Sequence, residues 1–571
     1  MLLGLYRRLV PRGVRALVAR RISPEYRNHL LFRMASTNPL WRLHNRAARG
    51  WIRLWHPGVA PGHVFVRDGR HVRLAEARPD ISPAQTRRDT FDFVRTALGA
   101  ADVPFFVVRG LRNLSSVIGV AAADRPQALA ALRSAAGHAA VYVCRVPGSG
   151  DLMPRPGYAA RSWRRVADAP VVRVVRYFSA RDGLFVLGAV HGCDLEFWAE
   201  EEGRLVAPRP NRVTATLPRQ AATVAAPDRL FTEFSASPER TFPTRREFTV
   251  SLIDEIRFPI DVVYTWVDGD DPAWQARRDA ELAAIGVTAL NKEAIGSSRF
   301  TSRDELRYSL RSLAMYAPWV RHIWIVTDAQ VPAWLDTAHT KITVVDHKEI
   351  FDDRGRLPTF NSHAIETQLH HIDGLAEHFL YLNDDVFFGR PVTPRLFFHS
   401  SGLAHFFLSR AQIGFGAVQL DDPPVLAAGK NNRRLIEQTF GRTLTQKMKH
   451  APHPLRRSVL AELETKFGAY IAETARHRFR HPDDFSVPSS LHHYYGYLTG
   501  RSVPGQIRYL YTDLADRETA YRLRRLLSSR SYDVFCLNDT DADDATQMRQ
   551  RTHLLWFLAS YFPLPGPYER T

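Results

Sequence analysis

The segment FLYLNDDVFFG (residues 379–389) places an amide and two adjacent carboxylates directly after a run of large apolar residues. Burying charge is expensive, so Asn383, Asp384 and Asp385 either form a polar turn after a buried strand or bind a cation. A rigid strand end carrying hard oxygen ligands suits Mg²⁺, which commonly bridges carboxylates to substrate phosphates. Taken alone, the motif leaves both interpretations open.

Three further apolar runs predict strands of the same sheet: IDVVYTWV (260–267), HIWIVTD (322–328) and KITVVD (341–346). Short runs of this kind are typical of parallel strands that are buried on both faces. Stretches with helical periodicity at 302–317 and 361–377 lie between them. The pattern predicts an α/β fold with a Rossmann-like, mostly parallel sheet and helical insertions, whose ligand crevice lies outside the carboxyl ends of the strands.

An acid follows the end of each predicted strand: Asp268, Asp328, Asp346 and the pair at 384–385. One such acid is an ordinary helix cap. Several acids at one edge of a sheet indicate a cation-assisted phosphate site.

The composition describes a globular protein of several domains. The chain has 571 residues, of which 45% are hydrophobic and 24% charged. Its formal net charge is +18, which points to an anionic partner such as nucleic acid, a membrane surface or a phosphorylated substrate. The three cysteines are far apart, which excludes a disulfide scaffold or a thiolate zinc site and favours a cytoplasmic location.

Much of the positive charge lies in residues 1–60, where 12 arginines stand against one acid. The apolar runs there are far shorter than the roughly 20 residues that span a bilayer, and we find no secretory signal pattern. The segment is expected either to lie on an anionic membrane surface, at the inner face of the plasma membrane, or to form a basic surface helix or arm.

Four parts of the chain are predicted. The basic segment (1–60) precedes an accessory α/β domain (61–205), in which strand and helix patterns alternate without a metal, phosphate or nucleophile motif. Residues 206–257 are rich in Pro, Arg and small residues, which predicts a linker. Residues 258–571 form the predicted catalytic domain.

The motifs of this last part occur together in one order. The segments IDVVYTWVDGDDPAW, RDELRYSLRSLAMYAPWVRHIWIVTDAQVPAWL, LPTFNSHAIE and FLYLNDDVFFG closely resemble the first two conserved regions of the Stealth family of sugar-phosphate transferases. KHAPHPLRRSVLAELE through FRHPDDFSV resembles the third region, and VFCLNDT with FPLPGPYE resembles the fourth. The family includes bacterial capsule and exopolysaccharide phosphotransferases and the animal lysosomal-enzyme N-acetylglucosamine-1-phosphotransferase. The resemblance spans about 260–569, so it implies nothing about the function of the residues before it.

The resemblance implies a reaction at phosphorus. An NDP-sugar would donate its sugar 1-phosphate to a hydroxyl of an acceptor glycan, releasing a nucleoside monophosphate and leaving a phosphodiester, in capsular or exopolysaccharide biosynthesis. It also implies Mg²⁺ or Mn²⁺ as the cofactor.

The resemblance assigns catalytic roles to four residues. His450, in KHAPH, is favoured as the general base that activates the sugar hydroxyl, and histidine is well suited to this at neutral pH. Asp385, Glu366 and Arg480 match further site positions of the family. Glu366 lies early in a predicted helix, where it could instead only stabilise the helix dipole.

The remaining site residues are assigned to metal and substrate. Arg307 and Arg311 lie four residues apart on one helix face; Arg311 is expected to face the donor phosphates or sugar, although a solvated basic face is the alternative. Trp266 could stack on a base or sugar, or belong to the core, and Gly269 would allow positive φ or close ligand approach. The expected metal ligands are Asp384, Asp385, Asn538 and Asp539, and the expected substrate-binding residues are Asp261, Trp266, Asp268, Gly269, Arg307, Arg311 and His453.

Two other functions compete with this interpretation. A metal-dependent glycosyltransferase would use the same acidic motif but release a nucleoside diphosphate. A basic binding protein would dock a membrane or nucleic acid through its first 60 residues. We find no helix-turn-helix, zinc or RNP-like pattern, so no nucleic-acid partner is expected.

Overall fold

The computed structural model describes most of the chain after residue 61. The described residues are 62–69, 71–137, 139–148, 150–180, 185–285, 300–516, 518–538 and 544–570, together with Ala47 and Gly50. The predicted basic segment therefore lies almost wholly outside the described residues, and its contact with a membrane stays a prediction. Within the described part, we find no helix that combines the length and the apolar character needed to span a membrane.

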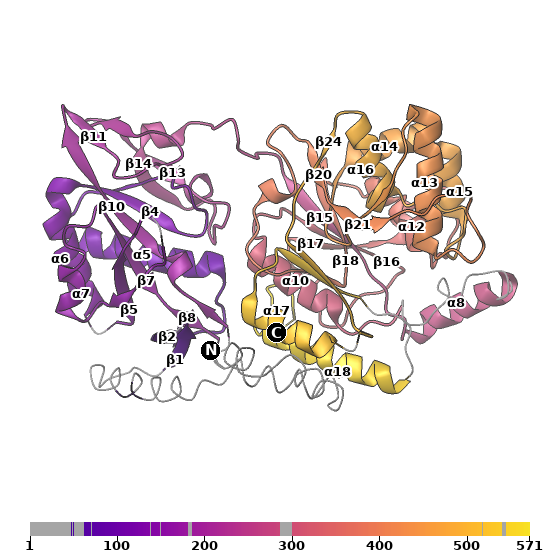
Figure 1. Ribbon diagram of the computed structural model, residues 1–571, viewed down its shortest axis with the longest axis horizontal. Coiled ribbons are helices and arrows are strands. Elements are labelled where there is room, and N and C mark those ends of the chain that lie inside the picture. The colour runs from indigo at the N-terminus through magenta and orange to yellow at the C-terminus, as the bar shows by residue number, and fades with distance from the viewer. Residues whose placement is uncertain are drawn as a thin grey trace, which may run out of the picture. The chain divides into compact units, whose positions relative to one another are not determined.

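The chain forms two compact units (Figure 1). Of the described residues, the first unit contains those up to 252 and 560–565, and the second contains those of 253–559 and 566–570.

The first unit is built on two sheets. Its strands are β1 (His63–Asp68), β2 (His71–Ala77), β3 (Phe106–Val107), β4 (Ser116–Ala121), β5 (Val141–Arg145), β6 (Arg155–Pro156), β7 (Val171–Arg176), β8 (Phe178–Ser179), β9 (Val186–Leu187), β10 (Cys193–Glu201), β11 (Arg204–Val206), β12 (Thr216–Pro218), β13 (Thr223–Pro227) and β14 (Thr241–Arg245). The larger sheet has the order β13-β14-β3-β4-β10-β7-β5-β6, with β11 and β12 joined to it through β10, and the smaller sheet has the order β1-β2-β8-β9.

Two helices pack on the larger sheet. In α5 (Pro83–Ala100), the Ser82 hydroxyl accepts a hydrogen bond from the Gln85 amide at 3.1 Å and so caps the first turn. Val94 of α5 and Leu132 of α6 (Arg125–Ala136) lie in one core with buried side chains of the strands. The mixed α/β class predicted for this part of the chain is confirmed.

The prediction of a linker at 206–257 is wrong. This stretch supplies β12, β13 and β14, and Thr244 of β14 pairs with Val107 of β3 within the large sheet. Pro218 and Pro227 end β12 and β13, and Pro243 lies within the short strand β14 near the sheet edge, where a missing backbone donor is tolerated. The boundary between the two units therefore falls near residue 252.

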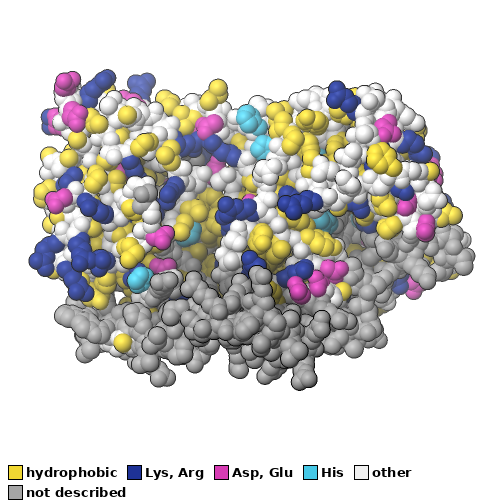
Figure 2. All heavy atoms as spheres, viewed as in Figure 1, with side chains coloured by type: hydrophobic (Ala, Val, Ile, Leu, Met, Phe, Trp, Pro, Cys, Tyr) yellow, Lys and Arg dark blue, Asp and Glu magenta, His cyan; other side chains and the backbone are white. Residues whose placement is uncertain are grey.

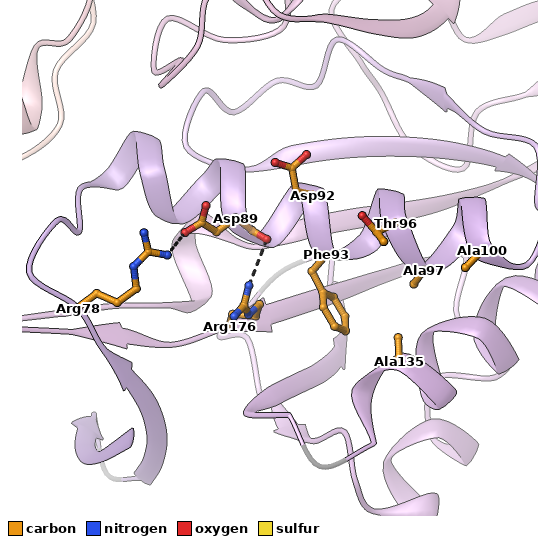
Figure 3. Close-up of a pocket in the computed structure, with 9 residues that line it drawn as sticks. All are labelled: Arg78, Asp89, Asp92, Phe93, Thr96, Ala97, Ala100, Ala135 and Arg176. Carbon is orange, nitrogen blue, oxygen red and sulfur yellow. Dashed lines mark hydrogen bonds and ion pairs between the residues drawn. The ribbon is translucent and has the colours of Figure 1, made fainter. Parts of the chain in front are cut away.

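The described surface of the first unit includes a hollow and a basic cluster. A hollow of about 550 Å³ lies beside α5; Arg78 and Arg176 at its edge bond to the side chain and the backbone oxygen of Asp89, respectively (Figure 3). Figure 2 shows basic side chains gathered near α7 (Ala160–Arg164). The exposed arginines of this region are Arg155, Arg161, Arg164 and Arg165.

The second unit is organised by a five-stranded sheet in the order β17-β16-β15-β18-β23. Its strands are β15 (Ile260–Thr265), β16 (Ile323–Thr327), β17 (Ile342–Asp346), β18 (His378–Asn383) and β23 (His453–Arg456). The first four strands run parallel to one another and β23 is antiparallel to β18. The parallel sheet predicted from the four apolar runs is thus confirmed.

Helices cover both faces of this sheet. Successive side chains of a strand point to opposite faces. Val263 of β15 shares a core with Leu460 and Ile471, whereas the neighbouring Tyr264 hydroxyl bonds to Ser309 Oγ at 2.8 Å on the other face. The helices that the structure describes after residue 253 are α8 (Pro272–Ile285), α10 (Glu305–Tyr316), α11 (His347–Ile350), α12 (Ser362–Glu366), α13 (Pro424–Phe440), α14 (Arg457–Lys466), α15 (Gly468–Arg476), α16 (His492–Leu498), α17 (Thr519–Ser529) and α18 (Asp544–Tyr561).

The predicted helix at 302–317 is present as α10, but the helix predicted at 361–377 is shorter. It consists of α12 and a separate single turn, η7 (Leu369–His371). Thr367 Oγ1 donates to the Ala364 carbonyl at 2.7 Å. Such local side-chain bonds compete with the helical backbone ladder, which explains why the helix ends there.

A three-stranded sheet brings the end of the chain to the carboxyl end of β18. It consists of β19 (Val386–Phe388), β26 (Val534–Asn538) and β25 (Tyr509–Asp513), with β26 antiparallel to β19. Val386 pairs with Cys536, so the same register sets Asn538 opposite Asp384. Two short pairs complete the unit: β20 (Ala404–Phe406) with β24 (Ser502–Pro504), and β21 (Leu408–Gln412) with β22 (Gln446–Met448).

Candidate active site

A cavity of about 680 Å³ opens at the carboxyl ends of the parallel strands of the second unit. This is the position where ligands bind in open α/β sheets. Its polar and charged lining comprises Thr265, Thr301, Arg303, Glu305, Asp328, His347, Thr359, Ser362, Asn383, Asp384, Asp385, His450, Arg480 and Asn538. Residues separated by more than 200 positions in the chain therefore meet in one cavity.

Three carboxylates form an acidic cluster in this cavity. Asp384 and Asp385 follow β18, and Glu305 begins α10. Burial raises the pKa of Glu305 to about 7. Burial and the like charges of Glu305 and Asp385 raise the pKa of Asp384 well above its ordinary value. A carboxylate cluster of this kind gains stability from a bound cation, because the cation offsets both desolvation and repulsion.

The donor atoms of the cluster are oxygens. Asn538, brought beside Asp384 by the β19–β26 pairing, adds an amide to the carboxylates of the cavity. The Cys536 thiol lies 3.2 Å from Asp385 Oδ2, and burial and that carboxylate raise the pKa of Cys536 well above its ordinary value. Carboxylate and amide oxygens are hard donors, so the oxygen atoms of the cluster fit a hard cation such as Mg²⁺ or Mn²⁺. Asp539 lies outside the described residues and stays a prediction.

His450 and Asp385 form a hydrogen-bonded pair at the cavity wall. Nε2 of His450 lies 3.1 Å from Asp385 Oδ1, and the His450 side chain is 34% exposed. Burial lowers the pKa of His450, but the charge and hydrogen bond of Asp385 outweigh it and raise the pKa overall. The two residues predicted to act together are thus in contact, although 65 positions separate them.

His453 is not placed as predicted. It lies on β23 with 7% exposure, and its Nδ1 is 3.1 Å from Nε2 of the buried His493. Burial and the neighbouring His493 and His450 lower the pKa of His453 well below its ordinary value. His453 therefore supports the strand behind His450 as a neutral core residue, and the substrate-binding prediction for it is wrong.

Arg480 and Glu366 lie at different depths. Arg480 lines the cavity, and its Nη2 donates to Ser362 Oγ at 2.7 Å. Glu366 is 4% exposed and accepts hydrogen bonds from Tyr381 Oη at 3.2 Å and Ser489 Oγ at 3.3 Å. Arg480 can contact a ligand directly, whereas Glu366 acts on the site from behind through its charge, which helps to raise the pKa of His450.

The residues that follow β15 have separate roles. Trp266 lines the cavity. Asp268 shapes the adjoining turn, because its Oδ1 accepts from the Asp270 amide at 3.0 Å. A Cβ on Gly269 would lie 2.4 Å from the Phe300 carbonyl oxygen, so this glycine permits close approach of two backbone segments rather than of a ligand.

Asp261 lies at the wrong end of its strand for substrate binding. It is fully buried near the start of β15 and accepts hydrogen bonds from Arg321 Nε at 2.7 Å and Trp324 Nε1 at 3.0 Å. Thr265, at the cavity end, is four residues further on, about 13 Å away at the rise of a strand. The prediction that Asp261 binds substrate is corrected to a structural role.

Arg307 and Arg311 share a helix face, as expected, but that face binds the C-terminal tail. Nε of each arginine donates to Glu569 at 2.6 Å, and Arg311 Nη2 adds a bond at 2.8 Å. Neither residue lines the cavity. The prediction that Arg311 faces the donor is wrong, because sequence spacing shows that two side chains point the same way but not what they meet.

Acids follow four strands, and those of two strands reach the cavity. Asp328 and the pair at 384–385 line the cavity. Asp328 also accepts a hydrogen bond from Arg277 Nη2 at 2.7 Å. Asp346 instead caps α11 in a capping box with Glu349.

The sequence reasoning missed several cavity residues. Glu305 and Arg303 stand in the segment RDELRY, which was assigned only as a helix start. Trp274, Phe300 and Phe360 form an aromatic wall, with ring centroids of Trp274 and Phe300 5.0 Å apart. Glu305 could have been proposed from the sequence, because it is an acid at the start of a predicted helix. The aromatic wall could not, because it depends on tertiary packing.

Comparison with known proteins agrees with the motifs. The models of Stealth protein conserved regions 1, 2, 3 and 4 match residues 258–286, 299–406, 449–497 and 524–571, respectively. An exopolysaccharide phosphotransferase of Streptomyces coelicolor is 48% identical over 99% of this chain and 97% of that protein. The exopolysaccharide phosphotransferase CpsY of Mycobacterium tuberculosis is 35% identical over 88% of this chain and 92% of that protein.

A similar solved structure is that of the galactosyltransferase LgtC with donor and acceptor sugar analogues. It is 11% identical, covers 52% of this chain and 95% of that chain, and has a TM-score of 0.28.

Proposed function

This chain belongs to the Stealth protein family and is a phosphotransferase, and from that premise we propose that it transfers a sugar 1-phosphate from an NDP-sugar to a hydroxyl of an acceptor glycan. The reaction releases a nucleoside monophosphate and leaves a phosphodiester, in the synthesis of an exopolysaccharide or capsule. The observation that carries the proposal is the meeting of the His450–Asp385 pair, the acidic cluster and Arg480 in one cavity.

His450 is the general base of the proposed reaction. With Nε2–H donating to Asp385, Nδ1 carries the lone pair that takes the proton from the acceptor hydroxyl. The hydroxyl oxygen forms a bond to the β-phosphorus of the donor, that is, the phosphorus attached to the sugar. The bond from this phosphorus to the bridging oxygen breaks, and the nucleoside monophosphate leaves with the electron pair.

Asp385 orients the base and stabilises its charged form. Its negative charge favours the imidazolium that forms when the hydroxyl is deprotonated, as the raised pKa of His450 indicates. Glu366 is buried behind the site, and its negative charge also raises the pKa of His450.

Cation binding and arginine stabilise the phosphates of the donor. Asp384, Asp385 and Asn538, with Glu305, would hold Mg²⁺ or Mn²⁺, which supplies positive charge against the diphosphate when bound. Arg480 lines the same cavity and offers guanidinium donors to a phosphoryl oxygen. Trp266 and the aromatic wall provide apolar surface for a base or sugar ring.

The alternative is a glycosyltransferase that attacks the anomeric carbon. The two reactions differ in the nucleotide that leaves. The full-length chain is incubated with Mg²⁺, a panel of NDP-sugars and glycan acceptors, and the released nucleotide is separated by ion-exchange chromatography. Acceptor-dependent release of a nucleoside monophosphate supports the proposal, and release of a nucleoside diphosphate would overturn it.

The His450→Gln variant is the control for this assay. It keeps the size and a hydrogen-bonding group near Asp385 but lacks a titratable base. Nucleotide release that persists unchanged in this variant would assign the base to another residue.

A further inference from the structure

A second group of side chains with metal-ligand chemistry lies in the second unit, outside the cavity lining. His370 and His371 belong to the single turn η7, and Glu464 belongs to α14. Both histidine Nε2 atoms approach the same carboxylate oxygen, Glu464 Oε2, His370 at 2.9 Å and His371 at 3.1 Å. One ligand atom from each residue lies within 4.8 Å of the other two.

The hydrogen bonds around His371 show that its Nε2 atom must bind either a proton or a metal ion. Its Nδ1 is 2.9 Å from the Ile350 carbonyl oxygen, which can only accept, so Nδ1 carries the hydrogen. In a neutral imidazole the other nitrogen, Nε2, then has a lone pair. This lone pair points at the Glu464 carboxylate, so a cation must lie between the two atoms, either a proton on Nε2 or a metal ion.

The groups around the cluster orient the ligands as they do in metal sites. A backbone carbonyl that accepts from Nδ1 fixes the ring of a metal-binding histidine, and Ile350 does this for His371. Arg354 Nη2 bonds to Glu464 Oε1 at 2.8 Å, so the other oxygen, Oε2, faces the imidazoles. Arg457 Nε donates to the His370 carbonyl oxygen at 2.9 Å and holds η7 against α14.

We propose that His370, His371 and Glu464 bind a Zn²⁺ ion that ties η7 to α14. Two imidazole nitrogens and one carboxylate oxygen are a common ligand set for zinc, and imidazole selects zinc over Mg²⁺. Ligand atoms of a tetrahedral zinc site stand about 3.3 Å apart; the two nitrogen–oxygen distances of 2.9 and 3.1 Å are a few tenths of an ångström shorter than this, and the two nitrogens lie within 4.8 Å of each other. The His371 side chain is 25% exposed and the Glu464 side chain 15%, which gives an ion access from solvent and leaves a position for water.

The proposed ion would stabilise the scaffold next to the active site. α12, which precedes η7, carries Ser362 and Glu366, and α14 follows β23. The side chains of the proposed site do not touch the catalytic cavity. The test therefore measures metal content and stability, and it is independent of the reaction that the enzyme catalyses.

The experiment uses the full-length chain with His450→Ala and Asp385→Asn, because Asp385 belongs both to the group with His450 and Cys536 and to the acidic cluster, so that the active site does not retain zinc itself. The protein is incubated with Zn²⁺, desalted and analysed by inductively coupled plasma mass spectrometry. In this background His371→Gln and Glu464→Gln are compared with His399→Gln, a matched change of an exposed histidine. Circular dichroism confirms that each variant is folded.

The parent and His399→Gln are expected to retain about one Zn²⁺ per chain, to show visible absorption bands when loaded with Co²⁺, and to melt at a higher temperature when Zn²⁺ is added. His371→Gln and Glu464→Gln are expected to lose most of the retained zinc and the thermal shift. A folded parent that retains no zinc would show that a proton alone fills the position, and this would overturn the proposal. Equal zinc in the parent and in both site variants would also overturn it.

Discussion

Asp194 in the first unit and the acidic cluster in the second unit are both buried, but their partners differ. In the first unit, Asp194 is 1% exposed and accepts from Arg173 Nε at 2.5 Å and Arg209 Nη2 at 2.7 Å. Although burial raises the pKa of Asp194, the two arginines lower it overall. In the second unit, Glu305 and Asp384 lie beside like charge, and the pKa of each is raised.

This difference separates a structural from a functional use of buried charge. A buried ion pair with complete partners holds a fold together, because loss of either partner leaves an uncompensated charge. Carboxylates gathered without equivalent compensation are costly to the fold, and such clusters concentrate at sites that bind cations or transfer protons. Four predictions test this contrast.

The largest effect is expected at the His450–Asp385 pair. His450→Gln and Asp385→Asn should each lower kcat by on the order of 10²- to 10⁴-fold, because the general base or its orienting charge is lost. Steady-state assays of nucleotide release measure this, and urea unfolding should show stability close to that of the wild type. A large loss of stability in either variant would contradict the functional assignment.

Substitution of Asp194 should have the opposite effect: it should lower stability and leave kcat unchanged. Asp194→Asn leaves Arg173 and Arg209 without their shared charge, and we expect a loss of about 3–5 kcal/mol in unfolding free energy. The kcat per folded molecule should stay unchanged. The matched control is Glu200→Gln, which breaks an exposed pair with Arg219 and should cost at most about 1 kcal/mol; equal losses in the two variants would refute the contrast.

The acidic cluster should make the stability of the metal-free protein fall as the pH rises. The pKa of Glu305 is about 7 in the folded protein and near 4.5 when unfolded, so the unfolded state releases its proton first. Metal-free protein should therefore lose stability as the pH rises from about 4.5 to 7, by up to about 3 kcal/mol. Glu305→Gln should remove this loss and weaken Mg²⁺ binding in calorimetry; a wild type whose stability is flat over this pH window would contradict the prediction.

Buried neutral histidines should give a smaller effect with the opposite sign. His492 is fully buried, its Nε2 accepts from the Arg456 amide at 3.0 Å, and burial lowers its pKa to about 3. Below the unfolded pKa of about 6.5 the unfolded state binds more protons, so stability falls as the pH falls. At pH 5 this amounts to about 2 kcal/mol. His492→Gln can accept the same hydrogen bond and should be less acid-sensitive by that amount in urea titrations, whereas His399→Gln should match the wild type.

The core of the fold could be predicted from local patterns. Each parallel strand of the second unit is a short apolar run bounded by polar residues, and its length and continuous apolar character predict a buried strand without tertiary information. The segment 206–257 could not be predicted this way, because its strands are short and rich in proline and small residues. Such strands are stabilised by pairing with the rest of the sheet rather than by their own propensity.

The site residues divide along the same line. Asp385, His450, Arg480 and Asn538 were predicted from their motifs, and the structure brings them together in one cavity. The roles of charged residues that form ion pairs within the protein were not predictable. Arg311 bonds to Glu569, which lies 258 residues away, and no local pattern encodes that contact.

The sequence by itself determined the family, the parallel strands and the chemical groups that carry the chemistry, because strand burial and motif chemistry are properties of neighbouring residues. The tertiary structure alone decided that Glu305 joins the acidic cluster, that His453 is a core residue and that Asp261 lies at the far end of its strand. These outcomes depend on strand direction, pairing register and the distance between segments, and those are set by packing across the whole unit.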